Sequence, residues 1–330
     1  MKITEVKTHV LSTPLDEPFA FSMGWVHRRS AVLVEVGTDE GVVGWGESLC
    51  HGLQPPQVAA AIIEHALKPI VIGQDPFDVE VLWERMYNLT RPFGQKGAVP
   101  NAISGVDIAI WDCLGRALGK PLHKLLGGAH RTSVQPYATG FYRRRGGNYP
   151  AEAVDEARRH LANGFTAMKL KIGFGVEEDI AHVHAVREAI GRGPKLMVDA
   201  NHAYNVGAAR RLLMAIEPDD IHWFEEPISP EDIDGYRELK NLTNIWLAAG
   251  ENEFTKVGFR EWVSRRAVDM HDARNLLAPF GPHGLCDQHE GRVLLALEDL
   301  IHPLRQHDRR ERPERLAELD LQVHHALHLR

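Results

Sequence analysis

The chain has 330 residues, of which 44% are hydrophobic and 25% charged, and its net charge is −7 at pH 7. This is the composition of a globular protein, and the length exceeds one ordinary core, so we expect a large barrel or two domains. The acidic balance gives no electrostatic reason to expect a nucleic acid or an anionic membrane as a partner. The sequence contains no signal-peptide core, no membrane-spanning stretch, and three cysteines without metal or disulfide spacing. We therefore predict a cytoplasmic protein.

Residues 1–128 predict a small α+β domain. Alternating and β-branched segments indicate a β-meander near the N-terminus. Its predicted strands are residues 3–11, 31–36 and 41–46. Apolar residues at helical spacing follow, and they indicate three helices. These are residues 56–67, 76–89 and 99–118.

Residues 129–269 show a different rhythm, in which short apolar runs alternate with amphipathic helices as in βαβ units. The predicted strands are residues 134–137, 167–172, 195–198, 221–224 and 245–249. Helices are predicted between them at residues 151–163, 176–190 and 206–216. This alternation predicts an α/β fold of the (β/α) TIM-barrel type, parallel and right-handed. A doubly wound sheet is the alternative, but no glycine-rich phosphate loop follows any of these strands.

Three acidic residues follow consecutive predicted strands. Asp199, Glu225 and Glu251 are equally spaced along the chain, one βα unit apart. In a parallel barrel such positions converge on one mouth, and converging carboxylates repel unless a cation lies among them. Hard oxygen ligands suit Mg²⁺. Strand-end acids can also be helix caps or solvated charges, but three in register favour a metal site.

Two lysines occupy one face of the strand predicted at residues 167–172. Lys169 and Lys171 are two positions apart, so their side chains point the same way. Neighbouring ammonium groups disfavour each other's charge, which favours the neutral form of one lysine and makes it a plausible general base. An ordinary pair of solvent-facing lysines fits poorly, because the apolar neighbours indicate a strand buried by helices.

These motifs resemble those of a known family. The segment PNAISGVDIAIWDCLGRALGKPLHKLLGG, residues 100–128, resembles the first signature of the mandelate racemase and muconate lactonising families of the enolase superfamily. The motifs MKLKIG, VDANHAY, WFEEP and AAGENEFT follow in the family's order and at its spacing, and the resemblance covers residues 1–269. It implies that residues 1–128 are a capping domain and that residues 129–269 carry the catalytic motifs of the barrel. It also implies a magnesium cofactor and removal of the proton next to a carboxylate.

By this resemblance the three strand-end acids match metal ligands. Lys171 matches the base that faces the α-carbon of the substrate, and Lys169 matches the neighbour that tunes it. Asn201 matches a position that contacts the surroundings of the metal or the substrate. Glu226 has no equivalent metal role, which indicates a structural acid.

The capping domain supplies two further candidates. Residues 19–25 match the mobile loop that closes over the site in relatives, and they contain Trp25. His51 lies near a second capping loop. Trp25 and His51 are therefore predicted substrate contacts, although single aromatics and histidines at a surface usually carry no function. Arg143, Arg144 and Arg145 could bind a second anionic group, or form a solvated charge run.

The chemistry implied by these residues is enolate formation from a carboxylate, with a cation offsetting the developing charge. The enolate can lose a β-hydroxyl, which makes the protein a lyase, a sugar-acid dehydratase. It can instead regain a proton on the other face, which gives a racemase or epimerase. A catalytically inactive relative is the third reading. The predicted partner is a small carboxylate substrate, and relatives suggest a homo-oligomer.

Residues 270–330 depart from the family's pattern. The histidine and aspartate pair expected on the opposite face of the substrate is missing, and the barrel is expected to be incomplete or divergent at this end. The abrupt change in composition favours a shifted reading frame or an unrelated replacement, with a divergent terminus as the alternative. Asp272 with His283 or His289 could replace the missing pair, although no motif supports this.

Overall fold

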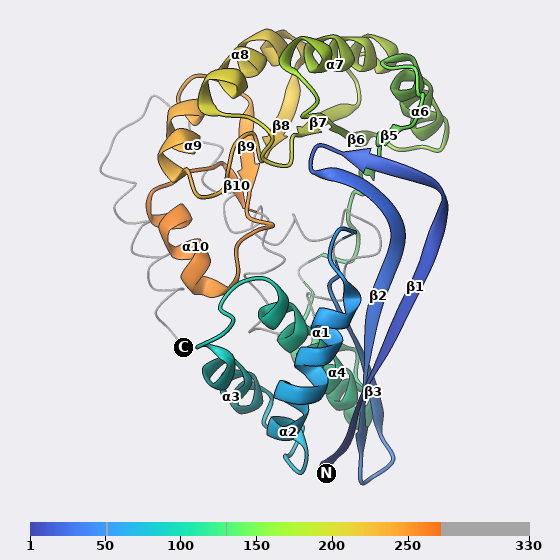
Figure 1. Cartoon of the computed structure of the whole chain (residues 1–330), viewed down its shortest axis with the longest axis vertical. Helices are drawn as coiled ribbons and strands as arrows, with labels where there is room; N and C mark the ends of the chain where they lie inside the picture. The colour runs from blue at the N-terminus through green and yellow to red at the C-terminus, as the bar shows by residue number, and fades with distance from the viewer. Residues whose placement is uncertain (51, 130, 272–330) are drawn as a thin grey trace. The chain divides into compact units, whose positions relative to one another are not determined.

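The computed structural model describes residues 1–50, 52–129 and 131–271 (Figure 1). Its first sheet is antiparallel and has the strand order β3-β2-β1-β5. The strands are β1 (Ile3–Phe21), β2 (Gly24–Thr38), β3 (Val43–Ser48) and β5 (Arg143–Arg144). The first three form the predicted meander, and β5 joins it from much later in the sequence.

β1 and β2 form one long hairpin, whose pairing extends from Ile3 opposite Thr38 to Phe21 opposite Gly24. Both strands are longer than predicted, because the distal part of β1 is largely exposed and lacks the alternation of a half-buried strand. The tip of this hairpin is the segment 19–25 that resembles a mobile capping loop. β5 extends the sheet at this tip.

Six helices follow the meander, one of them a π-helix. They are α1 (Pro56–Ile62), the π-helix η1 (Ile63–Leu67), α2 (Lys68–Val71), α3 (Val79–Thr90), α4 (Ala98–Leu118) and α5 (Leu122–Leu125). The helix α4 ends at Gly119, whose φ of 62° is the left-handed conformation common after a helix. A buried apolar core joins these helices to the inner faces of β1 and β2.

Glycines allow β3 to lie directly against α4. A Cβ atom on Gly44 would lie 2.2 Å from the backbone oxygen of Ala109, and one on Gly46 would lie 2.2 Å from that of Gly105. No larger residue fits at either position without moving the strand or the helix. This contact builds the N-terminal α+β domain.

The second sheet is parallel, with the strand order β10-β9-β8-β7-β6-β4. Its strands are β4 (Ala138–Thr139), β6 (Ala167–Lys171), β7 (Lys195–Asp199), β8 (Ile221–Glu225), β9 (Trp246–Ala249) and β10 (Met270–His271). The intervening helices are α6 (Ala151–Ala162), α7 (Val176–Ile190), α8 (Val206–Ile216), the 3₁₀ turn η2 (Glu217–Asp219), α9 (Ile233–Lys240) and α10 (Thr255–Ser264). Sequential strands lie side by side, as in a TIM-type barrel.

The helices cover the outer face of this sheet, as α7 and α8 do in Figure 1. Leu170, Val198 and Phe224 point outward into the apolar core beneath the helices. Met197 and Trp223 belong to a smaller cluster on the other face of the same strands. The alternation leaves the lysines and acids of β6, β7 and β8 on the inner face, where the predicted site lies.

One predicted strand is wrong. Residues 134–137 form no strand, and the first barrel strand is β4, which pairs with Met168 and Lys169 of β6. Val134 is 48% exposed, and Pro136 has no N–H to donate to a sheet. The predicted divergent tail lies outside the described residues, apart from β10. Among the residues described, no helix is long and apolar enough to cross a membrane.

Candidate active site

The predicted lysines and two of the predicted acids lie on three adjoining strands. Lys171 of β6 is in register with Asp199 of β7, and Asp199 is in register with Glu225 of β8. All are at the carboxyl ends of their strands, and each, like Lys169, is at most 5% exposed. Burial of so many charges is costly unless they are paired.

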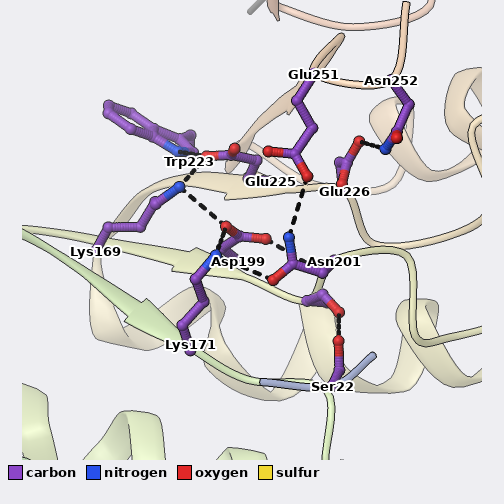
Figure 2. A network of polar contacts seen from close by, with 11 residues as sticks. Ser22, Lys169, Lys171, Asp199, Asn201, Trp223, Glu225, Glu226, Glu251 and Asn252 are labelled. Carbon is purple, nitrogen blue, oxygen red and sulfur yellow. Dashed lines mark hydrogen bonds and ion pairs between the residues drawn. The ribbon is translucent and has the colours of Figure 1, made fainter. Parts of the chain in front are cut away.

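Asp199 pairs with both lysines through one oxygen. The Nζ atom of Lys169 donates to Asp199 Oδ2 over 2.9 Å and to Glu225 Oε2 over 3.0 Å. Lys171 Nζ donates to the same Asp199 oxygen over 2.7 Å. Figure 2 shows the two ammonium groups converging on this carboxylate from one strand. The shared face predicted from the alternation is therefore confirmed.

Asn201 connects the second lysine to the third predicted acid. Its Oδ1 accepts from Lys171 Nζ over 3.0 Å, and its Nδ2 donates to Glu251 Oε1 over 3.2 Å (Figure 2). Its backbone N–H donates to Asp199 Oδ1 over 2.9 Å. The φ of Asn201 is 43°, in the left-handed region that asparagine tolerates better than most residues. The turn after β7 thus presents a side-chain amide between a base candidate and an acid.

The electrostatics of the site are set by burial and by these ion pairs. Burial alone would raise the pKa of Asp199, but the ammonium groups of Lys169 and Lys171 hold it well below its ordinary value. Glu226 behaves in the opposite way: burial, followed by the charges of Glu251 and of the other acids, raises its pKa well above the ordinary value. Its Oε1 accepts from the amide of Asn252 over 2.8 Å.

The donor set has the chemistry of a magnesium site. Asp199, Glu225 and Glu251 supply hard carboxylate oxygens, and their negative charge is strong enough to contribute to the raised pKa of Glu226. Within the described residues, however, no group of three such side chains stands close enough to enclose a metal. The ammonium group of Lys169 lies between Asp199 and Glu225 instead. The residues therefore fit a divalent cation by type, and binding one requires their side chains to rearrange.

The hairpin tip of the capping domain contacts this site. The ring of Phe21 lies 5.8 Å from Lys171 Nζ, and the Ser22 hydroxyl donates to the backbone oxygen of Ala200 over 2.7 Å. Trp25, on the same tip, packs beneath the guanidinium of Arg145 at 5.2 Å. Its role as a substrate contact stays a prediction. His51, the other predicted contact, lies outside the described residues.

Two residues of the candidate site were not predicted from the sequence. Thr139 ends β4 in register with Lys169, and its hydroxyl is buried without a hydrogen-bond partner among the described residues. Trp223 Nε1 donates to Glu225 Oε2 over 3.4 Å. Thr139 was missed because the first barrel strand was predicted at residues 134–137 and not at β4. Trp223 could have been found, because it is two residues from Glu225 on the same strand and so shares its face.

Comparisons with known proteins agree with this architecture. A sequence model of the mandelate racemase and muconate lactonizing enzyme N-terminal domain matches residues 3–127, and an enolase C-terminal domain-like model matches residues 152–274. The D-galactarolactone cycloisomerase of Agrobacterium fabrum is 43% identical over 270 residues, which are 82% of this chain and 70% of that protein. The arabinonate dehydratase of Saccharolobus solfataricus is 37% identical over 245 residues, 74% of this chain and 65% of that protein.

A solved structure supports the same assignment. The racemase from Streptomyces coelicolor A3(2), described with bound magnesium, has a TM-score of 0.74 and 32% identity to this chain. The match covers 81% of this chain and 74% of that one. The two family models together account for most of the chain, in the order that the fold displays. The chain therefore belongs to the mandelate racemase and muconate lactonising enzyme family of the enolase superfamily.

Proposed function

We propose that this protein catalyses magnesium-dependent removal of the proton α to a carboxylate, followed by β-elimination from a sugar acid. The observation that carries the proposal is the convergence of Lys169 and Lys171 on Asp199, with Glu225 and Glu251 bonded into the same network. A lysine pair beside three hard oxygen donors supplies both a base and the means to stabilise an enolate.

In this proposal Asp199, Glu225 and Glu251 hold the cation, which when bound offsets the negative charge that develops on the substrate carboxylate. Lys171 is the base. Proton removal needs a neutral amine, so Lys171 must release its ion pair with Asp199 before it acts. Lys169 keeps positive charge next to the site, which disfavours a second charge on Lys171.

The capping hairpin and the turn after β7 complete the machinery. Asn201 orients Lys171 through its Oδ1 atom. Phe21 places its aromatic ring 5.8 Å from the Lys171 ammonium group, where the face of the ring attracts the cation and helps to hold it in position. The Thr139 hydroxyl, with no partner among the described residues, is available to a hydroxyl or carboxylate of the substrate.

The fate of the enolate depends on the β-oxygen of the substrate. If that oxygen is a hydroxyl, its bond to the β-carbon breaks and the leaving hydroxide takes up one proton, equivalent to the one removed from the α-carbon, so that water is released as in a dehydratase. If it is the ring oxygen of a lactone, the same elimination opens the ring without loss of mass. The dehydratase relative supports the first outcome and the cycloisomerase relative supports the second. Dehydration of a sugar acid is the reaction we propose, and ring opening is the variant on the same chemistry.

Mass spectrometry of the products tests the proposal. The protein is incubated with Mg²⁺ and panels of aldonic acids, aldaric acids and their lactones, next to a Lys171→Ala variant. We expect loss of one water from at least one open-chain acid, abolished in the variant. Conversion of lactones alone at unchanged mass would replace dehydration by ring opening. A reaction that persists in Lys171→Ala would contradict the assigned base.

Racemisation or epimerisation is the second candidate, supported by the racemase relative of 32% identity. It predicts inversion of the α-carbon with no loss of water. Chiral chromatography of the recovered acid distinguishes it from elimination. It also needs an acid on the opposite face of the substrate, which among the described residues has no assigned candidate.

A further inference from the structure

Asp179 holds the loop that follows the lysine strand. It lies in the first turn of α7, is fully buried, and directs Oδ2 back toward this loop. That oxygen accepts hydrogen bonds from the backbone N–H of Gly173 over 2.6 Å, the N–H of Phe174 over 3.2 Å, and the hydroxyl of Tyr204. The Tyr204 hydroxyl in turn accepts from the N–H of Gly175 over 3.3 Å. Two side chains thus satisfy three successive backbone donors after β6.

Tyr204 extends this connection to two other barrel loops. It lies in the loop after β7, two residues before α8 begins. Its own N–H donates to the backbone oxygen of Pro227 over 3.2 Å. It also forms an isolated parallel bridge with Ile228, in the loop after β8. Asp179 and Tyr204 therefore connect three loops. The first follows β6, the strand that carries the two lysines, and the others follow β7 and β8, which each end in a predicted metal ligand.

The loop after β6 lies so close to the capping hairpin that a side chain at Gly173 would not fit. Gly173 has a φ of +102°, and a Cβ there would lie 2.7 Å from Ser22 Cβ and 2.8 Å from the backbone oxygen of Ala200. Ser22 and Ala200 are themselves joined by the 2.7 Å hydrogen bond at the hairpin tip. A shift of Gly173 would therefore displace Ser22 from its position against the barrel.

A simple helix cap does not account for this arrangement. A first-turn carboxylate commonly satisfies donors near its own helix N-terminus. Here one donor, Tyr204, comes from another βα unit, and Gly173 also contacts the capping hairpin. A buried carboxylate is stable only when such donors offset its desolvation, so the group depends on all of them.

We propose that Asp179 and Tyr204 are positioning residues that fix the Gly173–Gly175 turn and thereby seat the hairpin tip on the barrel beside Lys171. They touch neither the predicted base nor the predicted metal ligands directly. The structural part of this inference stands on the contacts alone. Its effect on turnover rests on the proposed function.

Hydrogen–deuterium exchange tests the structural part on the full chain. Tyr204→Phe removes only the hydroxyl, and Asp179→Asn removes the charge while keeping the shape. We expect both to speed exchange in the peptide covering residues 19–25 about tenfold, as for loss of a hydrogen bond to a charged group. The double variant should exchange no faster than the more affected single variant, because the two residues act as a unit.

Glu217→Gln is the matched control. Glu217 Oε1 also accepts from a backbone N–H, that of Asn244 over 2.9 Å, but it holds the turn before β9 at the opposite end of the strands. This variant should leave exchange at residues 19–25 unchanged. Unchanged exchange in Tyr204→Phe, or equal acceleration in Glu217→Gln, would overturn the proposal.

Kinetics provide the second readout where wild-type protein turns over an acid. In Tyr204→Phe we expect kcat/KM to fall about tenfold, mainly through KM, with an unchanged pH profile, and Ser22→Ala should reproduce this split. A purely structural role would lower the amount of active enzyme and so reduce apparent kcat alone, which would contradict the inference. If the wild type has no activity on any of the acids, the proposed function is wrong. The exchange experiment still tests whether Asp179 and Tyr204 hold the hairpin tip on the barrel.

Discussion

Lys171 of β6 donates to Asp199 of β7 over 2.7 Å, and the accepting oxygen also receives the ammonium group of Lys169. Asp199 is fully buried and therefore forms an ion pair with each of two buried cations, one of which, Lys169, also pairs with Glu225. Removing the charge of Asp199 takes one buried ion pair from each lysine, which is far more costly than losing an exposed ion pair.

Asp199→Asn should therefore destabilise the protein by about 3 to 5 kcal/mol in magnesium-free buffer, the usual cost of breaking a buried ion pair. Chemical denaturation measures the change. The control is Glu177→Gln, which breaks the ion pair with Arg211 between side chains that are 78% and 65% exposed. Equal stabilities of the two variants would show that the buried network contributes no more than a surface pair.

Magnesium affinity should depend on the three strand-end acids. Glu225→Gln and Glu251→Gln each replace a proposed anionic ligand by a neutral amide, so we expect Mg²⁺ to bind at least about tenfold more weakly. Isothermal titration calorimetry measures the affinity directly. Glu217→Gln, at the far end of the barrel strands, should bind like the wild type; equal weakening in all three variants would remove the metal site from these strands.

His182 should make stability sensitive to acid. It is buried, and burial together with the charge of Arg143 lowers its pKa from 6.5 to about 4. Because the folded-state pKa is the lower one, the unfolded chain takes up this proton first. Stability contributed by the neutral imidazole is present above pH 6.5 and is lost as the pH falls toward 4, by about 3 kcal/mol at most.

Denaturation curves recorded across this pH range test the histidine. The slope of stability against pH should be shallower in His182→Leu than in the wild type, whatever the absolute stability of the variant. Identical slopes would show that other groups cause the acid sensitivity.

An added methyl group in the contact between β3 and α4 should lower the stability of the protein. Gly46→Ala would place a Cβ 2.2 Å from a backbone oxygen, and we expect a loss of about 1 to 3 kcal/mol, typical of overpacking. Gly193→Ala is the control, because nothing lies within 4 Å of a Cβ at that position. Thermal unfolding compares the two; a Gly46→Ala protein as stable as the control would mean that the domain relaxes freely.

Much of the fold follows from local pattern. Helices α7 and α8 begin and end where helical spacing places them, and the strands bearing Lys171, Asp199 and Glu225 lie where apolar runs of that length occur. Their convergence could be predicted because a parallel barrel brings consecutive strand ends to one mouth. The lysines and acids at the strand ends are the candidate site residues whose position this rule fixes, whereas Trp25 and His51 were predicted only from the family resemblance.

Other features depend on contacts that no local pattern encodes. β4 has only two residues, too few for alternation to be visible, so Thr139 was missed. The hydrogen bond from Ser22 to Ala200 joins residues 178 positions apart. In the sequence, Asp179 is only one of three acids in the first turn of α7. Its hydrogen bond from the Tyr204 hydroxyl becomes visible only in the structure.

The most direct test of the central claim is proton exchange at the α-carbon. The protein is incubated in D₂O with Mg²⁺ and a sugar acid, and the recovered acid and products are read by mass spectrometry, with Lys171→Ala in parallel. Lys195→Ala, an exposed lysine at the start of β7, is the control. We predict deuterium uptake or loss of water in the wild type and in Lys195→Ala, reduced by a factor of at least about 10² in Lys171→Ala. Equal exchange in Lys171→Ala and the wild type would contradict the assignment of Lys171 as the base.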